Sequence, residues 1–489
     1  MAQRTAVIDI GSNSVRMIII EKTSRFAFHL LHEVKSKVRI SEDAYQNNGE
    51  LQDVSMQRAR LALKDFVQIA RSYDVRKTLC VATSAVRDAN NKKEFINLIK
   101  RECGLNIKVI SGEREAYLGG IACANLLSPL NAMTLDIGGG STECACIENT
   151  KVIDADSLDL GTVRLKELFF DNNDIKGAKH YIDKALEELK TKQQKHIIGV
   201  GGTFRALAQI ILNNTEHPID KVHGFSFDVS ELTDLGKKIL AAESKSELKE
   251  LGIKRDRFDV IKPGVLILLR IIKKVGAQRL TCSGVGVREG LYLSDLLRNN
   301  QDRFPSNFNP SMKYLIDQHS HNAAQRNLRV KLTKKLFELL HQDLELDASL
   351  EKELLIAAKL AKIGASHHFY SYESHSHYLT LSALEYGYTH EEIALISMLV
   401  LFQLGKGIKK SYLSQYNSLL PSSKVIKRLT NILALADALL ADHPLKINFD
   451  LTVENSILIV SFDKEIAYLS HESVLAIRSN EILVEFKTN

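Results

Sequence analysis

Apolar and polar positions alternate in two different ways along this chain. Up to about residue 298, short apolar runs typical of buried strands alternate with stretches whose apolar residues recur at helical spacing. Strands are expected within 5–20 (two, with a turn at Gly11 between them), 26–38, 78–82, 107–110, 133–137, 144–147, 151–158 and 196–200. Helices are expected at 54–73, 94–103, up to about 124, over most of 169–192, and at 204–212 and 291–297. This alternation predicts an α/β fold.

The pattern changes beyond a polar, proline-containing linker at 299–310. From 314 to 442 nearly all apolar residues follow the helical period, which predicts an all-α region. From 445 onward strands are expected at 447–453, 456–462 and 482–486, with a helical piece at 473–477. The predicted domains are therefore 1–125 and 126–300 (α/β), 311–442 (helical) and 445–489 (a small α+β tail).

The composition narrows the class of protein. A chain of 489 residues is too long for one core, and 45% hydrophobic with 25% charged residues is typical of globular proteins. No apolar run is long enough to cross a membrane, and residues 1–20 lack a signal-peptide cleavage pattern, so we expect a cytoplasmic protein with no membrane partner. The net charge of +6 suits a polyanionic ligand, but no basic stripe with interleaved aromatics indicates nucleic acid. The six scattered cysteines are expected to be free thiols.

The clearest chemical motif is the turn Asp136-Ile-Gly-Gly-Gly-Ser-Thr-Glu143, which follows an apolar strand. Consecutive glycines let backbone N–H groups approach and face an anion, because no Cβ stands in the way. The hydroxyls add donors, and a carboxylate at the strand end can hold a metal ion or orient a water. The turn is therefore predicted to cradle phosphate between two carboxylates.

A second turn, Asp9-Ile-Gly-Ser-Asn-Ser14, has the same order of residue types after another apolar run. Such self-similarity predicts a duplicated domain with phosphate bound between the halves. The alternative is a pair of ordinary hairpin turns. Two further strand-to-glycine turns occur at 196–203 and 281–290, and a helix that begins behind such glycines offers an anion site.

Two charged segments lie beside predicted strand ends. Arg87 follows Thr83-Ser-Ala-Val, where its guanidinium could reach a bound phosphate or form a surface salt bridge. Glu113 and Glu115 open the helix that runs toward 124. The helix dipole accounts for acidic residues in a first turn. It explains Glu113 well, and Glu115 only if no reaction needs it.

Six motifs together resemble the exopolyphosphatase/guanosine-pentaphosphate phosphohydrolase (Ppx/GppA) family. They are Asp-Ile-Gly-Ser-Asn-Ser, Thr-Ser-Ala-Val-Arg, Ser-Gly-Glu-Arg-Glu-Ala, Asp-Ile-Gly-Gly-Gly-Ser-Thr-Glu, Gly-Gly-Thr and Val-Arg-Glu-Gly, in this order over residues 5–298. The resemblance implies two actin-like (ribonuclease H-like) α/β domains with a cleft between them. In longer members an HD-like helical domain and a small α+β domain follow.

The resemblance also implies the roles of particular residues. Glu115 would activate the attacking water, and Asp136 and Glu143 would be the catalytic acidic pair around a metal ion. The phosphate-binding residues would be Asp9, Ser12, Asn13, Arg87, Gly138, Gly139, Gly140, Ser141, Gly201, Gly202 and Thr203. The implied cofactor is magnesium or manganese, with potassium as an optional further ion. The implied partners are inorganic polyphosphate or guanosine pentaphosphate and a second copy of the chain in a homodimer.

The helical region departs from the family pattern at one point. Some longer members have Leu-His-Asp-Ile-Gly where this chain has Leu360-Ala-Lys-Ile-Gly364. A lysine beside a metal ion would repel it, so we expect the helical fold without metal-dependent hydrolysis. The nearby histidines, at 367, 368, 375 and 377, are interpreted as surface or packing residues. This region is expected to lengthen a polyphosphate channel or to form a dimer interface.

The function predicted from the sequence is magnesium-assisted attack of water on the terminal phosphate of polyphosphate, because phosphoryl transfer needs positioning and charge neutralisation more than a covalent nucleophile. Hydrolysis of guanosine pentaphosphate is an alternative, since both substrates end in a phosphoanhydride. A non-catalytic regulator that binds polyphosphate or the nucleotide belongs to another class, and loss of the His-Asp pair favours it. A sugar-kinase-like transferase is a further alternative, although no additional acidic residue clearly serves a sugar hydroxyl.

Overall fold

The computed structural model describes residues 3–44, 47–128, 131–190, 194–405, 410–462, 467–477 and 481–488. The chain divides into two compact units, Met1–Asn309 and Pro310–Asn489, each with its own core. None of the described helices is both long and apolar enough to cross a membrane. All six cysteines are buried free thiols, as expected.

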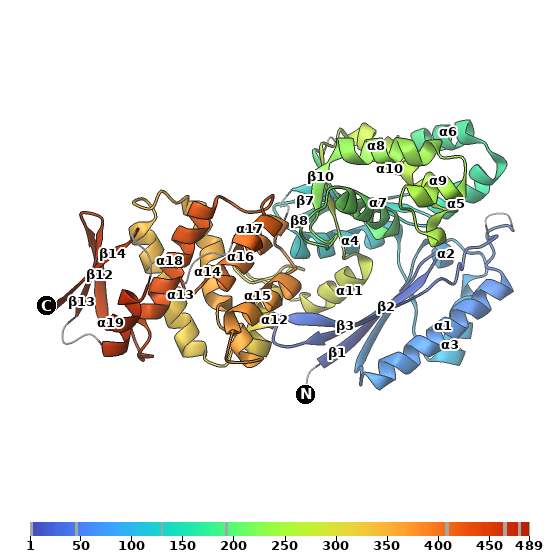
Figure 1. Cartoon of the computed structure of the whole chain (residues 1–489). Coiled ribbons are helices and arrows are strands. Elements are labelled where there is room, and N and C mark those ends of the chain that lie inside the picture. Colours follow the sequence, from blue (N-terminus) through green and yellow to red (C-terminus); the bar gives the residue numbers. More distant parts are fainter. Residues whose placement is uncertain are drawn as a thin grey trace. The chain divides into compact units, whose positions relative to one another are not determined.

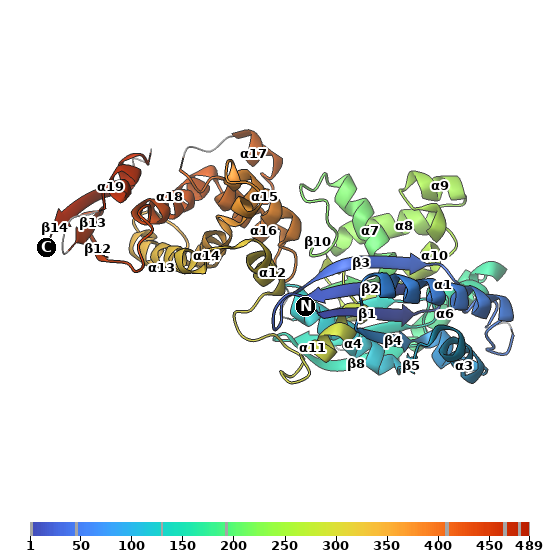
Figure 2. The same cartoon turned by 90° about the horizontal axis from the view of Figure 1, so that it is seen from below.

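Unit 1 contains two mixed sheets (Figures 1 and 2). The first has the order β3-β2-β1-β4-β5. Its strands are β1 (Gln3–Ile10), β2 (Val15–Lys22), β3 (Phe28–Ser36), β4 (Lys77–Ala82) and β5 (Lys108–Val109). The second has the order β10-β11-β9-β6-β7-β8. Its strands are β6 (Ala132–Ile137), β7 (Thr142–Glu148), β8 (Lys151–Leu158), β9 (His196–Val200), β10 (Ser226–Asp228) and β11 (Arg279–Cys282).

The two sheets repeat one topology. In each, an antiparallel meander of three strands (β1-β2-β3 and β6-β7-β8) is extended by two parallel strands (β4-β5 and β9-β11), and only β10 has no counterpart. Parallel neighbours require helical crossovers, which explains the alternating pattern of the sequence. The duplicated α/β fold of actin-like type is confirmed.

Helices cover both sheets. In the first half they are α1 (Asp53–Ser72), α2 (Ser84–Arg87), α3 (Lys92–Cys103) and α4 (Gly112–Leu126). In the second half they are α5 (Thr162–Leu168), α6 (Ile175–Ala185), α7 (Gly201–Asn214), α8 (Val229–Ala241), α9 (Lys245–Glu250), α10 (Ile261–Val275) and α11 (Val287–Leu296). The helix predicted over most of 169–192 is shorter in the structure. Asn173 has a left-handed φ of 54°, and α6 begins after it, where the side chain of the N-cap residue Asp174 accepts from the N–H of Gly177.

Two helices tie the halves together. Helix α4 follows β5 of the first sheet but packs on β7 and β8 of the second, whereas α11 follows β11 of the second sheet and packs on β1 of the first. The two helices meet at Gly290, where an added Cβ would lie 1.8 Å from the carbonyl oxygen of Leu118. Only glycine permits this approach. The exchange places the first turn of each helix between the two sheets.

Unit 2 is helical and ends in a small sheet. Its helices are α12 (Pro310–His319), α13 (Ala323–Leu340), α14 (Glu351–Leu360), α15 (Tyr372–Ala383), α16 (His390–Leu401), α17 (Lys410–Gln415) and α18 (Ser423–Leu439). Strands β12 (Phe449–Glu454), β13 (Ile457–Phe462) and β14 (Leu483–Thr488) form the sheet, and α19 (Tyr468–Leu475) precedes β14. The predicted helical region and α+β tail are confirmed.

Candidate functional site

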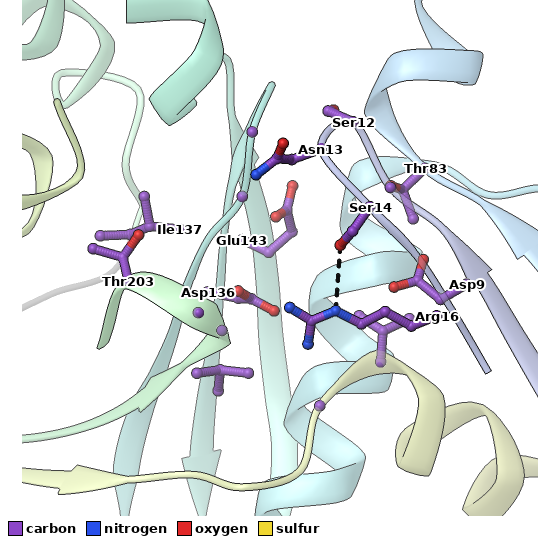
Figure 3. Close-up of a pocket in the computed structure, with 18 of the residues that line it drawn as sticks. Asp9, Ser12, Asn13, Ser14, Arg16, Thr83, Asp136, Ile137, Glu143 and Thr203 are labelled. Atoms are coloured by element: carbon purple, nitrogen blue, oxygen red, sulfur yellow. Dashed lines mark hydrogen bonds between the residues drawn. The ribbon is translucent and has the colours of Figure 1, made fainter. Parts of the chain in front are cut away.

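A pocket in unit 1 lies where the turns of the two sheets face each other (Figure 3). Most of its wall comes from the segments that follow β1, β4, β6, β9 and β11, which are equivalent positions in the two halves. The carboxyl ends of parallel strands gather at one edge of a sheet, which is where ligands bind in open α/β folds. The duplicated topology therefore builds one pocket from two copies of the same edge.

The first turn joins β1 to β2. The N–H of Gly11 donates to the carbonyl oxygen of Ser14 at 3.2 Å, and the hydroxyls of Ser12 and Ser84 are hydrogen-bonded at 3.1 Å. Asp9 lies opposite Arg16 in the strand register. One oxygen of Asp9, Oδ1, is buried and has no hydrogen-bond partner.

The second turn, between β6 and β7, has the same backbone geometry. The N–H of Gly138 donates to the carbonyl oxygen of Ser141 at 2.9 Å, and the carbonyl of Gly138 accepts from the N–H of Thr162, also at 2.9 Å. An added Cβ on Gly139 would stand 2.8 Å from Cβ of Ser12. The two turns thus meet closely across the pocket, as the duplicated motifs predicted.

A third glycine pair begins α7. Gly201 has φ of +81°, and a Cβ there would lie 2.2 Å from Oδ1 of Asp136. A Cβ on Gly202 would lie 2.2 Å from the guanidinium of Arg257. Backbone conformation and space both demand glycine at Gly201. The amino end of α7, with Thr203, therefore faces the pocket, where it offers an anion site.

Four carboxylates face this pocket: Asp9, Glu115, Asp136 and Glu143. Burial raises the pKa of each. The pKa of Asp9 rises to about 6, and that of Glu143 to about 7, the latter opposed by hydrogen bonds from Ser141 and Ser157. For Glu115 the charges of Glu143 and Asp9 add to burial, and its pKa lies well above the usual value. These four carboxylates are therefore easier to protonate than exposed ones.

Arg87 supports this group from behind. Its Nη1 donates to Oε2 of Glu115 at 3.2 Å and to the carbonyl oxygen of Ile110 at 3.3 Å. A second ion pair joins its Nε to Asp88. Arg87 does not itself line the pocket. The phosphate contact and the surface salt bridge were the two interpretations of its position, and in the structure it orients Glu115.

Five cations also line the pocket and were not predicted from the sequence: Arg16, Lys35, Arg205, Arg257 and Arg288. Burial and the neighbouring arginines Arg205 and Arg288 lower the pKa of Arg16 to about 10. Burial, together with Arg16 and Arg257, lowers the pKa of Lys35 to about 8. Cations that depress one another in this way are poised for an anion.

Two of these cations are held by the fold. Arg288 is 6% exposed and donates from Nη1 to Oε1 of Glu33 at 2.7 Å. Arg205 donates from Nε to the carbonyl oxygen of Gly201 at 3.1 Å and from Nη1 to that of Gly284 at 3.4 Å. Figure 3 shows the guanidinium of Arg16 reaching from the first half toward the carboxylate of Asp136 in the second.

Most of the residues singled out from the sequence come together here. The pocket is lined by Asp9, Ser12, Asn13, Glu115, Asp136, Gly138, Gly139, Ser141, Glu143, Gly201, Gly202 and Thr203. Gly140 stands apart from the wall, and its carbonyl oxygen accepts from Nε of Arg164 at 2.9 Å. Of the residues missed, Arg16 could have been found, because it holds in the first hairpin the register position that Glu143 holds in the second.

The donor set fits a magnesium ion. Carboxylate oxygens are the ligands that this hard cation prefers, and it is usually held by one or two carboxylates with water and phosphate completing the shell. Asp136 and Glu143 pair across β6 and β7, Asp9 has an unpartnered buried oxygen, and all three carboxylates have raised pKa values. Among the described residues, no three His, Cys, Asp or Glu side chains cluster as a complete ligand set.

Comparison with known proteins identifies the family to which both units are similar. A profile of the Ppx/GppA phosphatase family matches residues 18–299, and a profile of Ppx/GppA phosphatase domain III matches residues 309–474. The crystal structure of an Aquifex aeolicus Ppx/GppA family member is similar over 61% of this chain and 99% of its own, with 30% identity and a TM-score of 0.54. An exopolyphosphatase from Cytophaga hutchinsonii is similar over 62% of this chain and 100% of its own, with 25% identity and a TM-score of 0.55.

Proposed function

The chain belongs to the Ppx/GppA phosphatase family, and on this premise we propose that it is an exopolyphosphatase that hydrolyses the terminal phosphate of inorganic polyphosphate. One observation carries the proposal: glycine turns from both halves meet in a pocket that is lined by four carboxylates and five cations. A phosphoanhydride chain needs both, since its charge must be neutralised while water attacks. The similarity to a protein called an exopolyphosphatase supports the choice of substrate.

In this proposal Glu115 takes a proton from the attacking water. Its carboxylate is fixed by Arg87 at 3.2 Å, and a raised pKa suits a general base because efficient bases titrate near the working pH. The pocket contains the carboxylate but no described cysteine or histidine as a nucleophile. Direct attack by water therefore fits the residues present.

The glycine turns and the cations hold the phosphates in line. Backbone N–H groups of Gly139 and Gly202 and the hydroxyls of Ser12 and Ser141 offer donors, while Arg16, Arg205 and Arg288 supply charge. Preorganised donors stabilise the charge that develops on the transferred group without reorganising during the reaction. Asp136 and Glu143 would hold magnesium, which would neutralise phosphate oxygens when bound.

Guanosine pentaphosphate is the second candidate substrate, favoured by a groove that continues the pocket. The groove shares Arg16, Lys35, Gly202, Arg205 and Arg257 with the pocket and adds amide and apolar side chains. Among the amide and apolar residues added are Gln209, Asn213, Asn214, Ile210, Val222 and Leu235, and the groove also adds the carboxylates Glu33, Glu231, Asp234 and Glu250. Amides and apolar groups are what a base would contact, whereas a plain phosphate chain needs only cations.

The deciding experiment measures phosphate release with magnesium from long-chain polyphosphate and from guanosine pentaphosphate in parallel, using the wild type and Glu115→Gln. Release from polyphosphate that the variant lacks is the expected result. A preference for the nucleotide would change the substrate and leave the mechanism intact. Tight binding of either ligand without release would overturn the enzyme and leave a regulator that binds it.

A further inference from the structure

Unit 2 contains a pocket that the proposed function does not use. It lies where α13, α14 and α18 pack against one another (Figure 1) and encloses a cavity of about 180 Å³. We call it the cationic pocket, because its wall includes Arg326, Arg329, Lys359 and Lys362 with a single carboxylate, Asp437.

The carboxylate is already engaged. Oδ1 of Asp437 accepts from Nε of Arg329 at 2.6 Å and lies 3.3 Å from Nζ of Lys362, while Oδ2 is buried without a hydrogen-bond partner. Burial alone would raise the pKa of Asp437, but Arg329 and Lys362 outweigh it and hold the pKa below the usual value. Asp437 therefore stays ionised, with two cations beside its Oδ1. Lys362 is the residue whose presence predicts that no metal is bound here.

The other two cations have no such partner. Arg326 donates from Nη1 to the hydroxyl of Ser320 at 2.9 Å, and none of the described carboxylates lies within ion-pair distance of Arg326 or Lys359. Burial lowers the pKa of both, and the charge of Arg326 lowers that of Lys359 further. Half-buried cations that repel one another are stabilised by an anion that contacts both.

We propose that the cationic pocket binds a phosphate group through Arg326 and Lys359, with Arg329 and Lys362 completing its charge. Arg326 and Lys359, which pair with no described carboxylate, carry two positive charges, close in size to the charge of about −1.5 to −2 on a phosphate group at neutral pH. The cavity of about 180 Å³ has room for a phosphate group. This proposal goes beyond the proposed function and does not depend on it.

Two sources share this chemistry: free inorganic phosphate and the end of a phosphorylated chain. Site-resolved lysine acetylation of the full-length protein, read by mass spectrometry, can separate them. The reaction would be run in a chelator, which prevents turnover, with inorganic phosphate, with tripolyphosphate, or with potassium chloride at equal ionic strength. Three lysines report together: Lys359 in the cationic pocket, Lys35 in the cleft of unit 1, and exposed Lys331 on α13 as the reference.

We expect phosphate or tripolyphosphate to slow acetylation of Lys359 several-fold and to leave Lys331 unchanged. Protection by inorganic phosphate identifies the free ion, and protection by tripolyphosphate alone identifies a chain end. Arg326→Ala should weaken protection of Lys359 roughly tenfold, the loss expected for one charge-assisted hydrogen bond. The matched control Lys334→Ala removes a cation from the same helix outside the pocket and should change nothing.

Two results would overturn the proposal. If Lys35 is protected while Lys359 is not, phosphate binds only in the pocket of unit 1. If potassium chloride protects Lys359 equally well, the effect is charge screening and the pocket has no site. If Lys359 is protected and Lys35 is not, the result contradicts phosphate binding in the pocket of unit 1 and supports binding in the cationic pocket.

Discussion

The two halves of unit 1 share a backbone plan and differ in chemistry at each equivalent position. In the hairpins, Asp9 pairs with Arg16 across β1 and β2, whereas Asp136 pairs with Glu143 across β6 and β7. The first pair places a cation in the pocket, and the second concentrates negative charge there. The two halves thus share one backbone plan, and different residues at its equivalent positions give the pocket both signs of charge.

The exchanged helices differ in the same way. Glu115 lies in the first turn of α4 and faces the pocket, and Glu289 lies in the first turn of α11. Glu289 turns back to accept from the N–H of Gly286 at 2.8 Å, which closes its own helix end. One glutamate is left available for a reaction, and its counterpart is used for capping.

The largest effect is expected from a substitution that distinguishes Glu115 from Glu289. Glu115→Gln should lower kcat by about 10² to 10⁴, the range for losing a general base, with little change in KM. Glu289→Gln is the matched control, because a glutamine can keep the cap, and it should retain activity and most of its thermal stability. Steady-state kinetics with melting curves of both variants checks this. Equal losses in the two variants would show that Glu115 has no chemical role of its own.

The next effect concerns the strand-to-helix turns, where the first half has Thr83 and the second has Gly201. Gly201→Ala should reduce kcat/KM by about tenfold or more, because the added Cβ would push Asp136 from its place and strain a φ of +81°. Gly104 also has a positive φ, +69°, but nothing lies within 4 Å of an added Cβ. Gly104→Ala should therefore cost about 1 kcal/mol of stability and leave kinetics unchanged. Similar kinetics for both variants would contradict the steric account.

The sequence predicted the carboxylates and glycines of the pocket better than its cations. The carboxylates and glycines stand in short motifs whose order is visible along the chain, so Glu115, Asp136, Glu143 and the turns could be assigned to one pocket. The cations could not. Arg205 lies just past the predicted Gly-Gly-Thr turn and Lys35 in a predicted strand, and no local pattern marks either one, because only the tertiary fold brings them together. Arg87 was placed correctly near the site, but its partner, Glu115, is set by the packing of α4.

A smaller effect is expected in the pH dependence of activity, which distinguishes the carboxylates of the pocket from its cations. Activity should rise as Asp9 and Glu143 ionise, through pKa values of about 6 and about 7, and should fall as Lys35 loses its proton above about pH 8. Lys35→Arg stays charged, so its KM at pH 9 should be about three- to tenfold below that of the wild type and equal to it at pH 7. Lys37→Arg is the control, since Lys37 lies outside the pocket and donates to the carbonyl oxygen of Asp256. An alkaline limb that Lys35→Arg does not shift would mean that another group titrates.

The smallest effect separates the two hairpins by their response to magnesium. Asp9 and Glu143 bind protons more tightly in the folded protein than in the unfolded chain, so their contribution to stability is present below about pH 4 and is lost as the pH rises through about 6 to 7. A cation that binds the ionised carboxylates restores it, and each 1 kcal/mol regained raises Tm by about 2–4 °C in a unit of this size. Magnesium should therefore raise Tm by more at pH 8 than at pH 5.

Glu143→Gln should remove most of this shift, whereas Asp9→Asn should keep part of it, because Arg16 already faces Asp9 and no cation pairs with Glu143 across its hairpin. A magnesium shift of equal size at both pH values would show that the ion does not bind these carboxylates, and an equal loss in the two variants would show that the hairpins share it.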